Sequence, residues 1–513
     1  MVLASLLAAA GEFVRPDIDW HSIAPELVIV GTIVVCLLVD VFTSEQSRWT
    51  ASSIAGLGML AALVPILTLA GRDDITSMFG ASYVVDDFAL VLKGLFLVAG
   101  YLTVLLSTNY IAEGDYAEGE YYLLVLSAVL GMMVMASSRD LIGMFIALEM
   151  LSIPAYLLAG WRKRQLTGNE AGMKYYLMGV FASAVSLYGM SLVFGGTGTT
   201  SLVGIGNKLQ GNFGGEAIAV IGVVFTLIGF LFKVSAVPFH HWAPDTYEGA
   251  PTPVTAFLSV ASKTAGFVAI LLLVLISFMG QTETLRPLFF VLAALTMTVG
   301  NVIALRQTNV VRMFAYSSVA QAGFILAPLA VIGSGMGAGG VEGSSGRILS
   351  SIVTYVLIYT VVNLGAFAVI IAVSRRTRSG EIRSWSGLFT YAPGLAVAMA
   401  VFLFALGGIP PAAGWFAKFQ AFGAVVGGGY WMGYLMGAVM AVNSVLALAY
   451  YLRLMVVMFM DDAPDGDVTP VRVPVPLGAV VGLTLVATLA IGVLPGLVSD
   501  LADSATLSLG IGG

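Results

Sequence analysis

The sequence has few charged residues, few histidines and a single cysteine. Only 10% of its 513 residues are charged, whereas a soluble domain carries roughly 25%, so a large soluble core does not explain its composition. Cys36 alone excludes a disulfide framework and a cysteine-ligated metal or iron–sulfur site. The three histidines are too few and too poorly spaced for a haem or copper centre. From the cysteine and histidine counts we expect no metal or cofactor in this chain. The modest net charge of −6 and the lack of a basic cluster indicate no nucleic-acid partner.

Apolar runs fill most of the chain. Hydrophobic residues make up 58% of it and the mean hydropathy is +0.96, and a helix needs about 20 mostly apolar residues to cross a bilayer. We therefore predict an all-α integral membrane protein with fourteen transmembrane helices. The expected segments are 25–42, 51–70, 88–108, 121–137, 141–160, 172–194, 217–237, 253–279, 287–305, 313–332, 350–373, 392–428, 431–459 and 475–497.

These segments divide the chain into five parts. The first part is an extension whose short apolar run lacks the basic start of a cleaved signal. The parts are an N-terminal extension (1–24), helices 1–3 (25–108), a first group of five helices, 4–8 (121–279), a second group of five helices, 9–13 (287–459), and helix 14 (475–497).

Basic residues in the loops indicate the orientation. If the N-terminus is outside, the inner loops carry eleven arginines and lysines and the outer loops six. Inner loops of membrane proteins are enriched in these residues. We therefore expect a multi-pass protein of a bacterial inner (plasma) membrane, with the lipid bilayer around it and both termini outside, on the periplasmic side.

Lysine and arginine are distributed differently along the chain. Fifteen of the 17 basic residues in loops are arginines, whereas five of the seven lysines lie within predicted membrane segments. Arginine stays charged at any accessible pH, while a desolvated lysine can lose its proton. Ionisable groups inside a membrane are functional candidates by default, so this distribution predicts ion transport, with protons as the expected ion.

Four ionisable residues are the main candidates. Glu149 lies in the middle of its segment, and Lys263 lies about ten residues, or about 15 Å, into its own. Lys233 precedes a proline, and Lys418 follows the Gly-Pro interruption at 407–411. Broken helices at membrane depth are tolerated where they line a cavity or are buried in protein. For Glu149 the alternative is a structural ion pair or a protonated, hydrogen-bonded acid, and for Lys233 it is an ammonium that extends to the interface. Lys263 is too deep to reach the interface.

Two further lysines, Lys93 and Lys174, lie near the starts of their segments. A long lysine side chain in such a place can extend to the membrane interface. We therefore expect both ammonium groups at the interface.

The two predicted breaks share a spacing. Phe230-Leu231-Phe232 is followed by Pro238, and the same pattern recurs 172 residues later, from Phe402 to Pro410. The same offset sets Gln321 opposite Glu149. Transporters built from two repeats carry broken helices at matching places, so the spacing indicates an internal repeat.

Five segments carry longer patterns: ALEMLSIPAYLLAG (147–160), FKVSAVPFHHWAPDTYEGAPTPVTAFLSVASKTAGF (232–267), QTNVVRMFAYSSVAQAGF (307–324), YTVVNLGAFAVI (359–370) and GGIPPAAGWFAKF (407–419). Together they resemble the antiporter-like membrane subunits of respiratory complex I, most closely the subunit N type of bacterial NADH-quinone oxidoreductase. The resemblance implies an antiporter-like fold of fourteen helices, with two inverted five-helix repeats and broken helices 7 and 12.

The resemblance also implies roles. The chain would be a proton-translocating subunit of an NADH:quinone oxidoreductase with no redox catalysis of its own. FMN, iron–sulfur clusters and quinone would belong to partner subunits. Those partners would be the other membrane subunits, especially the M-type antiporter-like subunit and the small membrane subunits beside it. The implied proton-translocating residues are Glu149 as acidic partner, Lys233 as central, Lys263 as connecting and Lys418 as terminal lysine, followed by His240, Glu170 and Lys174.

Three features place the chain within that family. Lys418 disfavours the M type, whose pattern has a glutamate at the corresponding position. The chain ends soon after its fourteenth segment, so we expect it to lack the long lateral helix of the L type, and YTVVNLGAF resembles the N type.

One position departs from the pattern, because many relatives carry histidine where Gln321 stands. Glutamine does not titrate, so water or Lys263 would have to bridge this position.

Two other interpretations remain open. A subunit of a multisubunit cation/proton antiporter would share the fold and a Glu–Lys pair. A structural membrane scaffold would use the buried charges only as assembly ion pairs.

Overall fold

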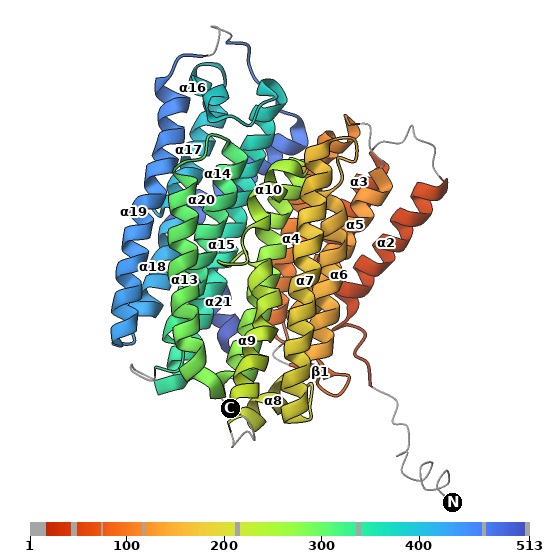
Figure 1. Ribbon diagram of the computed structural model, residues 1–513. Helices are drawn as coiled ribbons and strands as arrows, with labels where there is room; N and C mark the ends of the chain where they lie inside the picture. Colours follow the sequence, from red (N-terminus) through yellow and green to blue (C-terminus); the bar gives the residue numbers. More distant parts are fainter. Residues whose placement is uncertain are drawn as a thin grey trace, which may run out of the picture.

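The chain folds into a bundle of long helices (Figure 1). The computed structural model describes residues 17–42, 49–72, 75–114, 118–210, 216–334, 340–463 and 468–507. Most of the expected N-terminal extension, residues 1–16, lies outside these ranges. The α-helices are α2 (Ala24–Phe42), α3 (Thr50–Leu69), α4 (Asp87–Ala112), α5 (Glu118–Ser137), α6 (Leu141–Ala159), α7 (Leu166–Thr197), α8 (Leu202–Leu209), α9 (Glu216–Lys233), α10 (Trp242–Gly249), α11 (Thr252–Phe257), α12 (Lys263–Leu272), α13 (Thr282–Ala304), α14 (Val310–Leu326), α15 (Gly340–Thr377), α16 (Leu388–Tyr391), α17 (Pro393–Gly407), α18 (Gly414–Val426), α19 (Trp431–Met460), α20 (Val475–Val493) and α21 (Gly496–Leu507).

Within the described ranges, twelve helical stretches are long and apolar enough to cross a membrane. Two further apolar helices, Ala217–Lys233 and Pro393–Gly407, are shorter. All fourteen expected segments coincide with helix, which confirms the all-α membrane class. The count of fourteen crossings stays a prediction, because the two short helices do not span on length alone.

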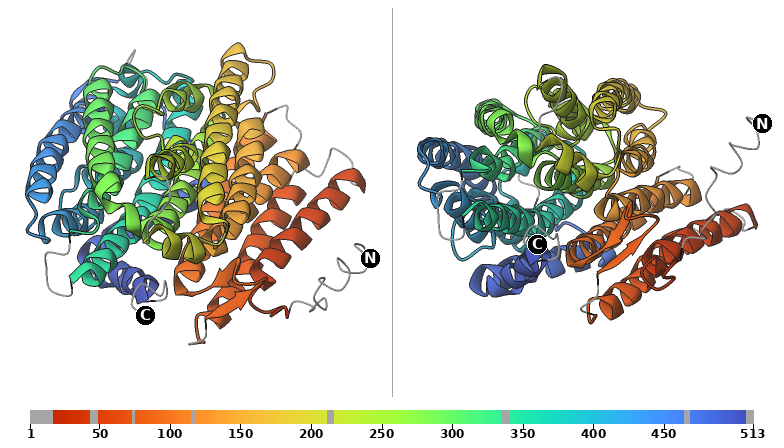
Figure 2. Two further views of the ribbon diagram at one scale, coloured as in Figure 1. Left: turned by 60° about the horizontal axis from the view of Figure 1, so that its bottom comes forward. Right: turned by 90° about the horizontal axis from the view of Figure 1, so that it is seen from below.

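The chain crosses the bundle from one edge to the other. Helices α2 and α3 lie at one edge and α19 at the opposite edge, with α15 running through the middle (Figures 1 and 2). In an apolar 18-residue stretch of each span, 94% of the residues are buried in Thr252–Ser277 and in Val310–Val331, and 89% in Gly343–Thr377, whereas only 28% are buried in α2. Polar side chains on the three enclosed spans therefore face protein rather than lipid.

Both predicted helix breaks are present. Helix α9 ends at Lys233, and a turn containing Ser235, with a positive φ of 59°, leads to the short α10. Helix α17 ends at Gly407, and Gly408 adopts the left-handed conformation (φ 86°) that glycine takes at little cost. Helix α18 then packs so closely on α17 that a Cβ at Gly414 would lie 1.8 Å from the Ala405 carbonyl oxygen.

Several local features were not expected from the sequence. Two three-residue strands, β1 (Thr76–Met78) and β2 (Tyr83–Val85), pair antiparallel before α4. The π-helical turns Leu258–Ser262 and Leu273–Ser277 interrupt the span that holds α11 and α12. Such turns inside α-helices are frequent at functional sites, and the first of them ends directly before Lys263.

Candidate functional site

Lys233 is buried at the end of α9. Its side chain lies where the helix breaks, and the residue is 2% exposed. Its Nζ donates a hydrogen bond to the Tyr175 hydroxyl at 3.0 Å and lies 5.2 Å from the centre of the Tyr156 ring. The ammonium is therefore held by a hydroxyl and by aromatic faces.

Glu149 lies near Lys233 without being bound to it. Among the described ion pairs none joins the two residues, but the carboxylate is close enough for an electrostatic interaction with the lysine. The Oε1 atom of Glu149 is buried and has no hydrogen-bond partner within the described chain. The structure thus brings the predicted acidic partner into the electrostatic range of Lys233, but not into contact.

Lys263 lies at the most enclosed part of the bundle and is 1% exposed. It is the first residue after the π turn, and its Nζ donates to the Ser318 carbonyl at 2.8 Å and to the Ser318 hydroxyl. Both acceptors belong to α14, so this lysine connects the two predicted repeats.

Lys418 lies on α18, just past the second break, and is half-buried. Its Nζ donates to the Gly407 carbonyl at 2.9 Å and lies 4.7 Å from the centre of the Phe324 ring. The last carbonyls of a helix have no partner within it and carry partial negative charge. The break therefore creates the acceptor that holds Lys418.

Polar groups fill the region between Lys263 and Lys418. The Gln321 Oε1 accepts a hydrogen bond from the Tyr355 hydroxyl at 2.6 Å, and its Nε2 donates to the Leu406 carbonyl at 3.1 Å. A small cavity of about 10 Å³ beside Gln321 is lined by Tyr355, Tyr359 and Ala417, among others, which is roughly the room that one water needs. The buried Tyr359 hydroxyl lacks a partner in the described chain. Gln321 therefore keeps this position polar although it does not titrate.

The three remaining predicted residues lie near α10. Lys174 forms ion pairs with Glu170 at 2.6 Å and with Asp245 at 2.5 Å, and its side chain is 43% exposed. The prediction of an accessible Lys174 is therefore correct.

His240 is 5% exposed, its Nδ1 has no partner within the described chain, and its ring lies 4.3 Å from that of His241.

The prediction that Lys93 reaches the interface is wrong. Lys93 is 0% exposed and its Nζ lies 2.8 Å from Oε1 of Glu26 on α2. It also donates to the Tyr83 hydroxyl at 3.1 Å. The lysine stays inside because a buried carboxylate from another helix offers a better partner than the interface. Glu26 and Lys93 both lie near the starts of predicted segments that begin on the same predicted side of the membrane. The sequence could therefore have indicated that the two side chains lie at the same depth and can pair.

Comparison with known proteins agrees with this arrangement. Residues 138–444 match the family model described as NADH:quinone oxidoreductase/Mrp antiporter, TM. The chain is 40% identical over 492 residues to NADH-quinone oxidoreductase subunit N of Trichlorobacter lovleyi, covering 95% of this chain and 97% of that protein. It is also 40% identical over 506 residues to subunit N of Geobacillus kaustophilus, covering 94% and 96%.

Solved structures share the fold. A chain of respiratory complex I from Thermus thermophilus is 31% identical, with a TM-score of 0.75, covering 93% of this chain and 99% of that one. A chain of the Mrp complex from Dietzia sp. DQ12-45-1b has a TM-score of 0.81 at 20% identity, covering 95% and 97%, which is a likeness of fold alone. The broken helices, the buried lysines and these matches together show that the chain belongs to the antiporter-like membrane subunits of NADH-quinone oxidoreductase, in the subunit N family.

Proposed function

We propose that this chain itself moves protons across the membrane, as a subunit of an NADH:quinone oxidoreductase whose redox reaction drives the movement. The observation that carries the proposal is the surroundings of Lys233, Lys263 and Lys418. Among the described residues, their polar contacts are hydroxyls and carbonyls, and no carboxylate forms an ion pair with them.

These surroundings suit reversible protonation. Burial disfavours the charged form of an amine, and a carboxylate in contact with the amine favours the charged form again. A lysine held only by neutral oxygens therefore depends on distant charges, such as that of Glu149, to decide whether it keeps its proton. Groups coupled in this way titrate together, so a change at one site is passed to the next.

The proposed order follows the placement of the residues. Glu149 adjusts the charge of Lys233, Lys263 links the two repeats, and Lys418 is the last lysine of the series. The Tyr355–Gln321 pair and the adjacent one-water cavity connect Lys263 to Lys418 with polar groups. We assign supporting roles to His240, Glu170 and Lys174 at the α10 end of the first repeat.

The remaining parts of the proposal concern the surroundings of the chain. FMN, iron–sulfur clusters and quinone belong to other subunits. The neighbours are other membrane subunits, including the M-type subunit and the small membrane subunits. The membrane is the bacterial plasma membrane, with both termini outside.

The test uses the assembled complex in inverted membrane vesicles, with NADH oxidation and proton uptake measured together. We expect Lys263→Ala to assemble and to abolish most of the proton uptake. Lys208→Ala serves as a control, because Lys208 is an exposed lysine on α8. Normal proton uptake by assembled Lys263→Ala would refute the proposal. Purification without flavin- and iron–sulfur-bearing partners, together with sodium-dependent transport, would favour the cation/proton antiporter instead.

A further inference from the structure

The short helix α10 contacts the partners of two lysines. At its start, the Trp242 ring stacks on the Tyr175 ring with centres 4.3 Å apart and planes 17° apart. Tyr175 is the residue whose hydroxyl binds Lys233. The Trp242 indole also donates to the Phe232 carbonyl at 3.1 Å, one residue before Lys233. The position of α10 therefore sets the position of the hydroxyl that holds Lys233.

The other end of α10 reaches Lys263. The Tyr247 hydroxyl lies 3.5 Å from the Ser318 hydroxyl, and Ser318 provides both polar contacts of Lys263. The Tyr247 carbonyl accepts a hydrogen bond from Thr255 at 2.8 Å, which fixes this end of α10 to α11. One helix of eight residues thus contacts the immediate partners of both lysines.

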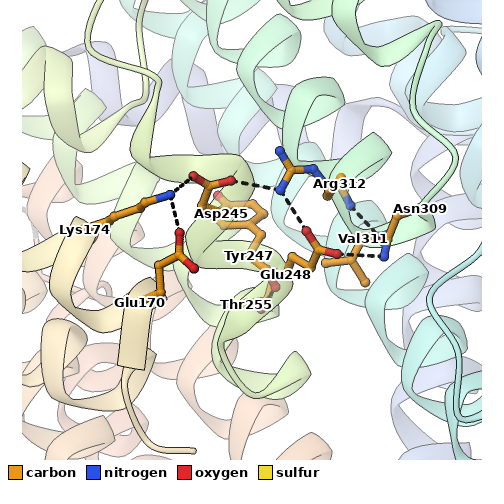
Figure 3. Close-up of polar contacts among 9 residues, drawn as sticks. All are labelled: Glu170, Lys174, Asp245, Tyr247, Glu248, Thr255, Asn309, Val311 and Arg312. Carbon is orange, nitrogen blue, oxygen red and sulfur yellow. Dashed lines mark hydrogen bonds and ion pairs between the residues drawn. The ribbon is translucent and has the colours of Figure 1, made fainter. Parts of the chain in front are cut away.

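Charged residues hold α10 between α7 and α14 (Figure 3). Asp245 accepts from Lys174 of α7 through Oδ2 at 2.5 Å, and from Arg312 of α14 through Oδ1 at 2.9 Å. Lys174 and Arg312 belong to the first and the second predicted repeat, respectively. Each oxygen of a single carboxylate is therefore bound to a different repeat.

The other carboxylates of this cluster bind one side only. Glu170 pairs with Lys174 at 2.6 Å, within α7. Glu248 pairs with Arg312 at 2.8 Å and accepts from Asn309 at 3.2 Å, so it binds only the second repeat. Of the carboxylates drawn in Figure 3, Asp245 alone pairs with a cation of α7 and a cation of α14.

We propose that Asp245 is a positioning residue that fixes α10 between α7 and α14, and thereby keeps the Lys233 and Lys263 sites in register. The inference rests on the proposed function, because register between the lysines matters only if protons pass between them. An asparagine at this position offers one acceptor oxygen, and its amide would face the second cation. It therefore cannot hold Lys174 of α7 and Arg312 of α14 through separate oxygens.

The experiment measures protons translocated per NADH oxidised by the assembled complex. We expect Asp245→Asn to lower this ratio by about three- to tenfold, and Asp245→Glu to restore a large part of it. The matched control is Glu113→Gln. Glu113 forms a comparable partly exposed ion pair with Arg375, 2.7 Å long, between the end of α4 and α15 and away from α10. The control should leave the ratio unchanged.

Arg312→Gln keeps the inference falsifiable if Asp245→Asn reduces assembly. Arginine does not exchange its proton at accessible pH, so a lower ratio in Arg312→Gln reports positioning and not proton relay. We also expect the effects of Asp245→Asn and Arg312→Gln to be less than additive in the double variant, because both changes remove the Asp245–Arg312 pair.

Two outcomes separate the inference from the function. If Lys263→Ala stops proton uptake but Asp245→Asn and Arg312→Gln match Glu113→Gln, the positioning role of Asp245 is wrong and the proposed function stands. If Lys263→Ala translocates protons normally, the proposed function itself is wrong.

Discussion

The ammonium of Lys93 lies 2.8 Å from the carboxylate of Glu26, and this ion pair is buried between α2 and α4. Neither residue belongs to the predicted repeats. The pair fixes the first transmembrane helix to the third. Its energetics differ from those of Lys233, Lys263 and Lys418 because here the two charges compensate each other.

We expect Lys93→Met to destabilise the protein by about 3–5 kcal/mol, because Glu26 would be left as a buried, uncompensated charge. Replacing both residues by methionine should recover most of this loss, since a buried ion pair and an apolar pair of similar volume are often of similar stability. Thermal unfolding of the purified complex measures both variants. If the double variant is as unstable as Lys93→Met, the pair contributes more than charge compensation.

We expect Lys418→Arg to lower proton translocation at least about tenfold. Arginine can still donate to the Gly407 carbonyl, but it keeps its proton. The half-buried site has more room than that of Lys263, so assembly should persist. Proton uptake in vesicles with unchanged amounts of assembled complex is the measurement, and full uptake would show that Lys418 need not release a proton.

We expect Gly414→Ala to destabilise the second broken helix, because the new Cβ would lie 1.8 Å from the Ala405 carbonyl oxygen. Overpacking of this kind costs about 1–3 kcal/mol or more. Gly423→Ala on the same helix is the control, since nothing lies within 4 Å of its Cβ position. The control should be neutral or stabilising by up to about 1 kcal/mol through helix propensity. Equal effects in thermal unfolding would contradict the close packing of α18 on α17.

We expect Gln321→Leu to slow proton translocation and to destabilise the protein by about 1–3 kcal/mol, because the Tyr355 hydroxyl loses its buried acceptor. Gln321→His can still accept this hydrogen bond and should retain translocation. Proton uptake per NADH oxidised and thermal unfolding distinguish the two variants. Unimpaired translocation in Gln321→Leu would exclude this residue from the path.

The ion pairs of Asp245 should be insensitive to pH near neutrality. Partial burial opposes ionisation, but hydrogen bonds from Lys174 and Arg312 outweigh it and lower the pKa of Asp245 below its usual value. Because the pKa of Asp245 is lower in the folded state, its ionised form contributes fully to stability at pH values above the unfolded-state pKa of about 3.9. This contribution is lost as the pH falls through the folded-state pKa.

We therefore expect the difference in thermal stability between the wild type and Asp245→Asn to be constant from about pH 5 to about pH 8, and to shrink below about pH 4. Melting of both complexes across this range is the measurement. A difference that disappears between about pH 6 and about pH 8 would mean that Asp245 is not held ionised by its two cations.

Local chemistry made the broken helices predictable. Proline removes a backbone donor and glycine permits a left-handed residue, so Pro238 and Gly408 mark the breaks in the sequence itself. The burial of Lys263 was also predictable, because no side chain reaches an interface from about 15 Å inside a span.

Partners from distant segments were not predictable. Lys93 was assigned to the interface because it lies near the start of its segment. Its partner, Glu26, stands 67 positions earlier (93 − 26), and nothing in the local sequence joins them. Arg312 was counted only as a loop charge that sets the orientation, although its guanidinium contacts Asp245 and Glu248. Such contacts depend on how helices pack, which hydropathy does not specify.

Because α2 is much less buried than the central spans, the two regions should differ in how well they tolerate amino-acid substitutions. A lipid-facing position needs only an apolar side chain, and many shapes satisfy lipid equally well. A position in Val310–Val331, where most side chains are buried, must also match the volume of its neighbours. Random apolar substitutions in α2 should therefore be mostly silent, while the same exchanges in α14 should be mostly damaging, although hydropathy alone ranks both helices as membrane spans.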